Sequence, residues 1–462
     1  MGAAPQLCRQ VAGEVVSNSP LQHCPRMGRF AAGMNRRRAF RSGLMIAGAV
    51  CLSLCSLVAI QGDELELPVV AKPSAYPTFR LRGRIDTDFL WSDQTPENRA
   101  VFGDLPDTVG LRRARIGAEG HFSPDSRYVA EVDLASGEVV LRDVYLAHGN
   151  VQQSGEYKAG HMREPFSLEG GTSANSFAFL ERSSINALDP ARNWGVGFTR
   201  GGADERWTLS GGVFQAGTDP SDLEFEAGTT TAVTIRGTGL AWYEHEGKQL
   251  MHFGLAISER LPDQGVVLVR QRPSSPLLDL GDSSDSPFAP RLKIPANFQQ
   301  LFNVQWAAVN GSLWTQAEWY GTLINQRDGG DVFLHGSHAD VGYFLTGEQR
   351  SYLKDAGVFG PVSVHRPVFS KFSSKDQAEE LGPGAWELTA RLSYLNYDDG
   401  DMPTDTLGNP AGVILPQATA GVNWYLADRM RLMFNYVYSA PDEVSAGQSS
   451  ASVFGLRLGM FW

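Results

Sequence analysis

The sequence predicts an all-β protein whose strands cross a membrane as one transmembrane, antiparallel, up-and-down β-barrel. Three observations lead to this fold class. Segments in which apolar and polar residues alternate recur along the chain, and no segment after residue 62 is apolar for long enough to form a spanning helix. The chain also ends on alternating apolar residues that finish at Trp462.

Composition favours many short strands over helices. Of the 462 residues, 42% are hydrophobic and 20% are charged, and the chain contains 50 Gly, 24 Phe, 13 Tyr and 10 Trp. Glycine and aromatic residues are therefore abundant, while long apolar runs are scarce. This composition suits strands that face two different environments.

The amino end has the pattern of a secretory signal peptide that starts within the chain. Met34 is followed by arginines at 36–38 and 41, and then by the uncharged stretch 42–62 with an apolar centre at 44–60. A transmembrane anchor is the alternative, although the apolar centre is short for a spanning helix. The predicted division is an untranslated or dispensable extension at 1–33, a signal peptide at 34–62, a short periplasmic linker at 63–75 and a transmembrane barrel at 76–462.

Cysteine and charge content exclude several classes of site. All four cysteines lie within the first 55 residues, so a chain without this segment has neither a disulfide framework nor a thiolate metal site. The formal net charge of −11 and the pI near 5.4 argue against a nucleic-acid partner, because binding to a phosphate backbone needs a basic face.

The segment 79–90 is the clearest predicted strand. One face carries Phe79, Leu81, Gly83, Ile85, Thr87 and Phe89, and the other carries Arg80, Arg82, Arg84, Asp86 and Asp88. A period of two is typical of a strand. A face of arginines and aspartates needs water or mutual pairing, so we expect the apolar face to contact lipid and the charged face to point into a water-filled lumen.

The same pattern recurs at intervals through the rest of the chain. The further predicted strands are 111–122, 128–134, 139–147, 194–200, 207–214, 231–243, 250–258, 298–309, 312–324, 340–345, 385–397, 417–426 and 429–438. Several are about ten residues long, which is the length that a tilted transmembrane strand needs. Since unpaired strand edges are not tolerated in lipid, such strands have to close into a barrel.

Connections of two lengths separate these strands. Short turns are expected at 123–127 and 136–137, and long polar stretches at 261–297 and 346–384. Outer-membrane barrels have short periplasmic turns and long outer loops. We therefore expect the two short turns at one end of the barrel and the two long stretches at the other.

The carboxyl end forms the last predicted strand. Apolar residues occupy every second position, namely Phe454, Leu456, Leu458, Met460 and the terminal Trp462. A final strand that ends in an aromatic residue resembles the signal read by the outer-membrane barrel assembly machinery. A soluble β protein that ends this way by chance is the alternative.

Several of these segments together resemble the phosphate-selective porin O and P family. The resemblance rests on 111–117 (LRRARIG), 141–146 (LRDVYL), 160–169 (GHMREPFSLE), 180–183 (LERS), 342–348 (GYFLTGE), 384–391 (GAWELTAR) and 421–426 (GVNWYL). It implies a 16-stranded barrel with inward-folded loops, a homotrimer, and a location in the outer membrane of a Gram-negative-type bacterium. It also implies contact with outer-membrane lipid and a pore that attracts small anions.

Three arginine clusters are the candidates for the pore lining and for anion binding. They are Arg80, Arg82 and Arg84; Arg113 and Arg115; and Arg163, Arg182 and Arg192, which lie in or beside the stretch that the resemblance makes the constriction loop. Simple alternation places Arg112 on the opposite face from Arg113. The alternative for each cluster is an arginine paired with a nearby carboxylate such as Asp86 or Asp88. Carboxylates at Asp143, Glu164, Glu169 and Glu181 leave the choice between phosphate and other anions open.

The expected function is diffusive passage of small anions, phosphate or related, through a basic constriction. A general or differently selective porin is the alternative, and an outer-membrane barrel enzyme is the alternative from another class. No catalytic residues, cofactor or metal are expected, because the pair at 245–246 (His-Glu) lacks the second histidine of a zinc protease and no nucleophile motif is present.

Overall fold

The computed structural model describes residues 76–216, 230–262, 265–269, 292–369, 381–401, 412–443 and 447–462. The predicted extension, signal peptide and linker at 1–75 lie outside the described residues. Most of the long polar stretch at 261–297 lies outside them as well. None of the described helices is long and apolar enough to cross a membrane.

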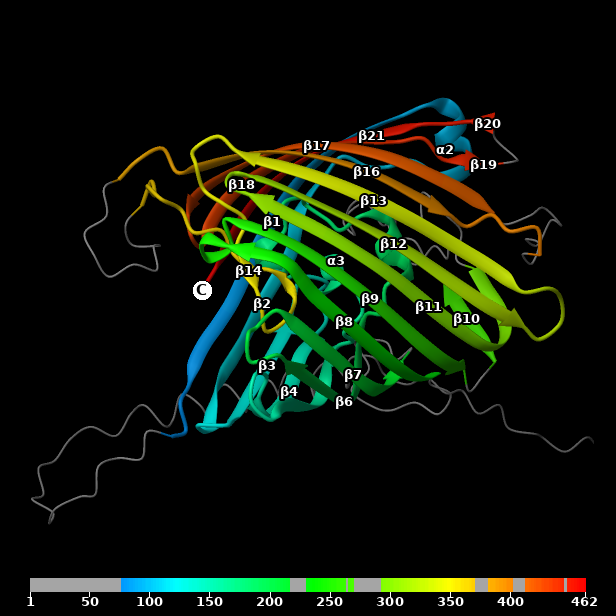
Figure 1. Cartoon of the computed structure of the whole chain (residues 1–462). Helices are drawn as coiled ribbons and strands as arrows, with labels where there is room; N and C mark the ends of the chain where they lie inside the picture. Colours follow the sequence, from blue (N-terminus) through cyan, green and yellow to red (C-terminus); the bar gives the residue numbers. More distant parts are fainter. Residues whose placement is uncertain are drawn as a thin grey trace, which may run out of the picture. The chain divides into compact units, whose positions relative to one another are not determined.

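Sixteen strands of the described chain form the wall of a barrel, and each pairs antiparallel with its two neighbours (Figure 1). In chain order they are β1 (Arg80–Gln94), β2 (Thr108–Ser123), β3 (Ser126–Asp133), β4 (Val140–Asn150), β5 (Gly155–Arg163), β6 (Arg192–Gly201), β7 (Trp207–Ala216), β8 (Thr230–Glu244), β9 (Gln249–Pro262), β11 (Leu292–Asn310), β12 (Leu313–Gln326), β13 (Val332–Phe344), β16 (Ala385–Asn396), β17 (Val413–Ala427), β18 (Met430–Ser439) and β21 (Ala451–Phe461). Three short strands extend this wall, β10 (Val266–Val269), β19 (Asp442–Glu443) and β20 (Gly447–Gln448). The prediction of a 16-stranded antiparallel barrel is confirmed.

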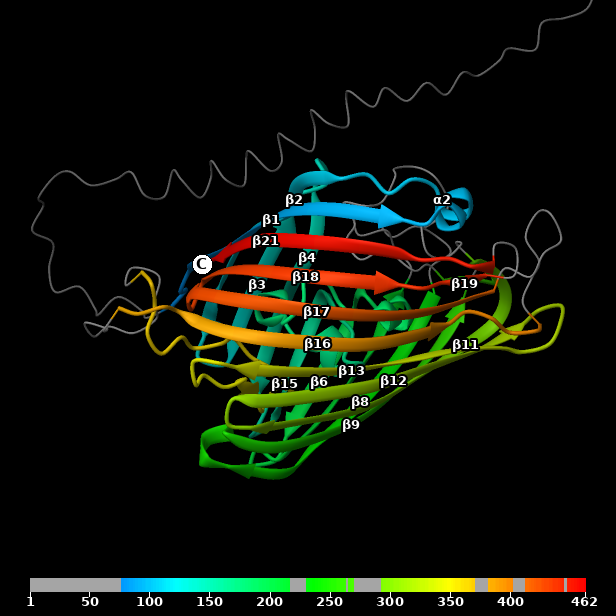
Figure 2. The same ribbon diagram turned by 90° about the horizontal axis from the view of Figure 1, so that it is seen from above.

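The barrel closes because its first and last strands pair. The register runs from Arg84 opposite Phe461 to Gln94 opposite Ala451, and Figure 2 shows β1 and β21 side by side. Closure leaves no unpaired edge in the wall, which is the condition for strands to cross a bilayer.

The alternation predicted for 79–90 is confirmed. On β1, Ile85 and Phe89 are each 39% exposed on the outer face, whereas Asp86 and Asp88 are fully buried inside. Because the two faces alternate residue by residue, a single strand supplies both the apolar outer surface and charged groups to the interior.

Two strands were missed or shortened in the prediction from sequence. The first is β5, where glycines at 155 and 160 adopt φ values of 87° and 138° and interrupt the apolar positions. The second is β13, which begins at Val332, eight residues before the predicted 340–345 segment. In β5 the outward positions hold few large apolar residues. In the first half of β13, Val332 and Leu334 face inward while His335 and Ser337 are on the other face, so apolar residues are not confined to one face.

The two short turns were expected at one end of the barrel and the two long stretches at the other, and both expectations are wrong. Consecutive connections of an antiparallel wall alternate between its ends, so the turns at 124–125 and at 134–139 lie at opposite ends. By the same alternation, the 345–384 connection between β13 and β16 lies at the end that holds the short turns 124–125, 311–312 and 428–429. The length of a single connection therefore does not show at which end it lies, whereas the set of short turns that share an end does.

Two connections fold into the interior. The first, at 164–191, links β5 to β6 and contains α3 (Leu168–Gly171), η1 (Ala174–Ser176) and η2 (Ser184–Leu188); we call it the constriction loop (Figure 1). The second is the connection at 345–384, called the 345–384 insertion; its described residues 345–369 contain β14 (Tyr352–Leu353) and β15 (Val358–Phe359). A further helix, α2 (Pro96–Phe102), lies in the connection between β1 and β2.

Both inward segments pack on apolar side chains that point in from the wall. Phe166 and Ile185 of the constriction loop join a cluster with Tyr320, while Phe359 of the 345–384 insertion packs edge-on against Trp314. The core of this protein is therefore inside the barrel, where it holds the two inward segments in place.

Candidate functional site

The constriction loop is fastened to the wall at the start of α3. The backbone N–H groups of Leu168 and Glu169 donate to the carboxylate of Glu318 on β12, at 3.0 and 2.6 Å. Arg391 on β16 donates to the Glu169 carboxylate at 2.6 Å. These contacts cross from the loop to two different wall strands, so they fix how far the loop extends across the lumen.

A second fastening point is Glu181, near the middle of the constriction loop. Its carboxylate accepts hydrogen bonds from Arg112 at 2.7 Å and from Arg457 at 2.8 Å, and it forms an ion pair with Arg113 at 3.2 Å. Burial would raise the pKa of the Glu181 carboxyl, but the three guanidinium groups hold that pKa well below its usual range. Glu181 therefore remains ionised across the physiological pH range.

Arg182 donates only to backbone carbonyls, unlike the arginines that pair with the carboxylate of Glu181. Its guanidinium donates to the backbone carbonyls of Glu169, Gly170 and Thr172 and lies 4.4 Å from the centre of the Phe177 ring. No ion pair with a carboxylate is found for Arg182 among the described residues. Its guanidinium thus donates only to neutral groups of the loop, while the carboxylates of Asp189 and Glu169 lie near enough to interact with its charge.

The 345–384 insertion fills one side of the lumen. Arg236 on β8 donates to the carbonyls of Ala356 and Gly357 at 3.0 and 2.7 Å, and the Tyr352 hydroxyl lies 2.7 Å from Nδ1 of His252 on β9. The side of the lumen formed by β8 and β9 is therefore occupied by protein.

An open space lies beside the constriction loop, along β1–β6 and β16–β18. It is a cavity of about 680 Å³. Its lining includes eleven basic side chains, Arg82, Arg84, Arg112, Arg113, Arg115, Arg142, Lys158, Arg163, Arg182, Arg192 and Arg391, and four carboxylates, Glu131, Asp143, Glu181 and Asp189. Eleven against four leaves a formal excess of seven positive charges in the lining of a chain that is negative overall.

The first predicted cluster is divided by the structure. Arg84 is buried, donates to Asp86 at 2.6 Å and reaches Asn175 of the constriction loop at 2.6 Å. Arg82 lines the cavity and pairs with Glu131 at 2.9 Å. Arg80 pairs with Glu119 outside the cavity lining, with a side chain 70% exposed.

The second predicted cluster lines the cavity together with Arg112, which the sequence had placed on the opposite face. The register between β1 and β2 shifts after Asp86, so that Arg113 and Leu111 face consecutive residues of β1 and Arg112 has no opposite residue. This β-bulge turns Arg112 inward beside Arg113. The placement predicted for Arg112 is therefore wrong, and the lumen gains a charge that simple alternation does not assign to it.

A second bulge has the same effect two strands further along the wall. Between β3 and β4 the register shifts after Ala130, and both Arg142 and Asp143 line the cavity. Bulges are frequent beside functional sites because they redirect side chains. In this barrel two bulges each bring an additional charged side chain into the cavity.

The third predicted cluster sits where the constriction loop leaves and rejoins the wall. Arg163 at the end of β5 pairs with Asp189 at 2.9 Å, and Arg192 at the start of β6 pairs with Asp143 at 3.0 Å. Together with Arg182 these residues line the cavity. All eight predicted arginines except Arg80 are thus brought together around one space.

Four basic side chains in the lining of the cavity were not predicted from the sequence. They are Arg112 and Arg142 at the two bulges, Lys158 on the missed strand β5, and Arg391 on β16. Arg391 alone carried a usable signal, because it alternates with Glu387 and Thr389 on the inward face of a predicted strand.

Comparison with known proteins identifies the family. The family model described as phosphate-selective porin O and P matches residues 79–460. The chain belongs to this family. Porin O of Pseudomonas aeruginosa is 25% identical over 425 residues, which cover 87% of this chain and 92% of that protein.

Solved structures of outer-membrane proteins are also similar to this porin. The loop L8 deletion mutant of OmpT from Vibrio cholerae aligns with a TM-score of 0.49 and 14% identity over 83% of this chain and 99% of that one. An anion-selective porin from Comamonas acidovorans aligns with a TM-score of 0.47 and 12% identity, over 84% of this chain and all of that chain, 100%.

Family membership places the protein in the outer membrane of a Gram-negative bacterium. Family and fold point to a channel rather than an enzyme. Since outer-membrane barrels have short turns on the periplasmic side, the end that holds the turns 124–125, 311–312 and 428–429 is the periplasmic end.

The residues expected to form the assembly signal lie on the lipid-facing side of β21. Phe454, Leu458 and Trp462 are exposed, and Leu456 and Met460 are half-buried on the same face. An ideal Cβ on Gly83 would lie 2.2 Å from the ring of Trp462, so this ring covers the glycine on the adjoining strand.

Proposed function

We propose that this porin allows the diffusive passage of small anions, phosphate or related ones, through the basic cavity beside the constriction loop. The observation that carries the proposal is the excess of cationic over anionic side chains in the cavity lining. A cleft lined by one sign of charge raises the local concentration of ions of the opposite sign. Rings of arginine or lysine are the expected lining of an anion pore.

The arginines remain available to an anion although most of them are paired. In the pairs Arg82–Glu131, Arg115–Asp133, Arg142–Asp133 and Arg163–Asp189, the arginine side chains are 29%, 12%, 25% and 18% exposed and the carboxylates at most 6%. In these four pairs water in the cavity therefore meets the guanidinium first, whereas the two members of the pairs Arg112–Glu181 and Arg192–Asp143 are about equally exposed. An ion in the cavity is closer to the positive member of the first four pairs, so these pairs add a field that favours anions.

The phosphate part of the proposal rests on chemistry and on the family. A guanidinium presents several N–H donors in a planar fork that matches the oxygens of phosphate, which chloride cannot exploit in the same way. The basic groups of the lining come from at least five strands and the loop, so an anion in the cavity has cationic groups from several elements around the same space.

The proposal is tested by the reversal potential in a planar bilayer under a potassium chloride gradient. We expect an anion-selective channel whose chloride current is reduced by phosphate at low concentration. Arg142→Gln should lower the anion-to-cation permeability ratio, because Arg142 lines the cavity. Arg80→Gln is the matched control, because Arg80 lies outside the lining and should leave the ratio unchanged.

Two results would overturn the proposal at different levels. A cation-selective or unselective wild-type channel would identify a general or differently selective porin. Anion selectivity without block by phosphate would retain the anion pore and reject the phosphate site.

Processing and assembly belong to the same proposal. We infer that residues 1–33 are dispensable, that 34–62 form a signal peptide and 63–75 a linker, and that the mature chain forms a homotrimer after the barrel assembly machinery reads its last strand. Amino-terminal sequencing of protein extracted from the membrane should give a start near residue 63. Light scattering in detergent should give three chains per particle.

A further inference from the structure

The cavity beside the constriction loop has two sides of different chemistry. Arginines gather along β1–β6, and neutral polar side chains gather along β16–β18; we call these the arginine side and the neutral side. Around the wall, five strands separate β4 from β17 in one direction and nine in the other. The two sides therefore border the same space from well-separated parts of the barrel, so one solute can meet both.

The arginine side is a cluster of guanidinium groups from the wall and the constriction loop. Its arginines are Arg82, Arg115, Arg142, Arg163, Arg182 and Arg192, and the carboxylates that pair with them are Glu131, Asp133, Asp143 and Asp189. Arg192 lies near enough to four of the other five arginines to interact with their charges. The carboxylate of Asp143 interacts with Arg82 as well as with Arg163. These groups therefore act on one part of the cavity.

The net charge of the arginine side matches that of a phosphate monoester. Six guanidinium groups against four carboxylates leave two positive charges. The other arginines of β1 and β2 in the lining pair separately with Asp86 and Glu181. A phosphate monoester carries about −1.5 to −2 charges at pH 7 and has three strong acceptor oxygens. The planar fork of a guanidinium fits such oxygens.

The neutral side offers hydroxyl and amide groups and no carboxylate. Its described lining residues are Arg391, Ser393, Gln417, Thr419, Asn435 and Val437. Gln417 and Thr419 are half-buried, so the water of the cavity reaches them. The amide of Gln417 uses one of its two N–H groups on Ser439, at 2.7 Å. Hydroxyl and amide groups both donate and accept hydrogen bonds, which suits the hydroxyl groups of a polyol.

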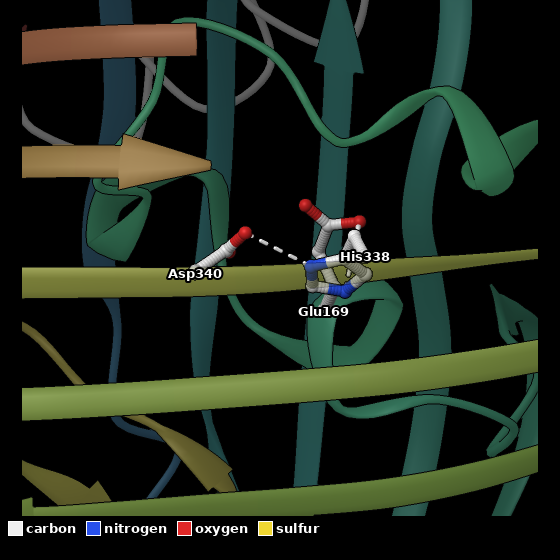
Figure 3. Close-up of side chains that lie close together, drawn as sticks. All are labelled: Glu169, His338 and Asp340. Atoms are coloured by element: carbon white, nitrogen blue, oxygen red, sulfur yellow. Dashed lines mark hydrogen bonds and ion pairs between the residues drawn. The ribbon is translucent and has the colours of Figure 1, made fainter. Parts of the chain in front are cut away.

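Arg391 is the one charged side chain in this part of the described lining, and its charge is matched inside the wall. It donates to Asp340 at 2.8 Å and to Glu169 at 2.6 Å. Both carboxylates lie beside the ring of His338 (Figure 3), and Glu318 lies 3.6 Å from the same ring. One guanidinium among these carboxylates leaves no excess of positive charge, so a second anionic group of a solute gains little on the neutral side.

Size and aromatic content narrow the class of solute further. The cavity of about 680 Å³ lies within the range of about 300 to 1,000 Å³ that is usual for small-molecule sites, and one inorganic phosphate fills only a small part of it. Two aromatic rings of the lining already have a cation over one face, since Arg391 lies 4.1 Å from the centre of Phe179 and Lys158 lies 5.7 Å from that of Tyr145. These contacts compete with the stacking of a nucleobase, whereas a hydroxylated body needs no ring.

We propose that the solutes of this pore are phosphorylated polyols of the sugar-phosphate class. The phosphate group lies against the arginine side, and the hydroxyl groups of the body meet Gln417, Thr419 and the other polar groups of the neutral side. This inference rests on the proposed anion pathway and names the solute class of the same cavity. Passage remains diffusive, because contacts spread over two sides hold the solute weakly at each point.

The test is block of the chloride current through the full-length porin in a planar bilayer. Glucose 6-phosphate and methyl phosphate are the two probes, because both are phosphate monoesters and only the first has a hydroxylated body. Glucose 6-phosphate should block half of the current at a concentration about two- to tenfold lower than methyl phosphate does, as expected for one additional hydrogen bond. Glucose, which has no charge, should not block.

Substitutions on the neutral side test which residues meet the hydroxylated body. Gln417→Leu together with Thr419→Val removes polar groups at nearly constant size and should remove most of the advantage of glucose 6-phosphate over methyl phosphate. Arg192→Gln should raise the half-blocking concentrations of both esters. Thr315→Val is the matched control and should change neither, because Thr315 lies on the outer face of β12. The heat-modified shift of the band on gels reports that each variant is folded.

The inference is overturned if glucose 6-phosphate blocks no better than methyl phosphate, or if the folded double variant keeps the full difference between them. Block by methyl phosphate and by inorganic phosphate would then still support the proposed anion pathway. If no phosphate compound blocks the chloride current, the proposed phosphate site has failed as well, so the two failures can be told apart. Should the double variant not fold, the comparison of the two esters on the wild type decides the matter.

Discussion

Replacing Glu181 with Gln should raise the anion-to-cation permeability ratio of the channel. Glu181 is one of only four carboxylates in the lining of the cavity and neutralises part of the charge of Arg112, Arg113 and Arg457. Glutamine keeps the size and one acceptor oxygen, so the hydrogen bonds to one oxygen can persist, whereas those that Arg112 and Arg113 donate to the other oxygen are lost together with one negative charge. The lumen then carries one additional net positive charge at the constriction loop.

The magnitude follows from Coulomb's law. A unit charge about 5 Å from a passing ion changes its energy by about 0.8 kcal/mol in bulk water and several-fold more at lower effective dielectric. An anion gains what a cation loses, so the difference is about 1.6 kcal/mol. Screening with a Debye length of about 10 Å at 0.1 M salt keeps more than half of this. About 1 kcal/mol therefore remains after screening. Because 1.4 kcal/mol corresponds to a tenfold change, the anion-to-cation permeability ratio should rise about fivefold.

The assay is the reversal potential in a planar bilayer. The mean salt concentration is 0.1 M, because the expected magnitude assumes the screening length of about 10 Å at that concentration. Asp104→Asn is the control, because Asp104 pairs with Arg99 on an exposed connection and its side chain is 77% exposed. An unchanged or lowered ratio for Glu181→Gln, with the control at wild-type values, would refute the reasoning. Such a result would place the ion path away from the constriction loop.

The pH dependence of the same residue gives a second check. The arginines hold the pKa of Glu181 below its usual range, so its charge persists as the pH falls from 7 to about 5. The difference between wild type and Glu181→Gln should therefore be retained at about pH 5 and should close only below the ordinary carboxyl pKa of about 4.3. The stability that this carboxylate contributes to the loop is lost over the same acidic range, as the pH falls through its lowered pKa.

Three further predictions concern the wall. A polar thiol reagent should label Arg82→Cys from the lumen and spare Ile85→Cys on the lipid face of β1; equal labelling would contradict the assignment of the two faces. Gly83→Val should clash with the ring of Trp462, cost about 1 to 3 kcal/mol and lower the temperature at which the folded band converts, whereas Gly237→Val has open space at its Cβ and should not. Deleting Trp462 should reduce the folded fraction in the outer membrane, and undiminished assembly would remove its role as a signal.

The fold could be predicted from the sequence because the period of two is a property of every wall strand. In β1 the apolar residues Ile85 and Phe89 alternate with Asp86 and Asp88, and lipid on one side and polar interior on the other enforce this pattern. The prediction failed at β5, because its outward positions hold few large apolar residues and its glycines interrupt the alternation. A strand is thus easiest to predict from sequence where its lipid-facing positions hold large apolar residues.

The composition of the cavity lining could be predicted only in part. Alternation correctly placed Arg113 and Arg115 in the lumen, but the bulges that turn Arg112 and Arg142 inward are set by pairing with the neighbouring strand. The bulge in β2 changes the phase of the alternation, since Val109 and Leu111 face outward before it and Ile116 faces outward after it. An alternation counted straight through the strand therefore misplaces Arg112. The sequence also gave no indication that Glu169 lies beside Glu318 and His338, because Glu169 is on a loop 149 residues before Glu318, while Glu318 and His338 face each other on the consecutive strands β12 and β13.

Pairing with carboxylates was the alternative considered for each arginine cluster, and the structure shows that pairing and pore lining are compatible. Arg142 and Arg115 share Asp133, yet their side chains are 25% and 12% exposed while that of Asp133 is 4% exposed. The carboxylate reduces the cost of holding two arginines close together, and the more exposed guanidinium groups still determine the sign of the field in the water. For a porin with a net charge of −11, ion preference therefore depends on which member of each pair faces the lumen and not on the total charge.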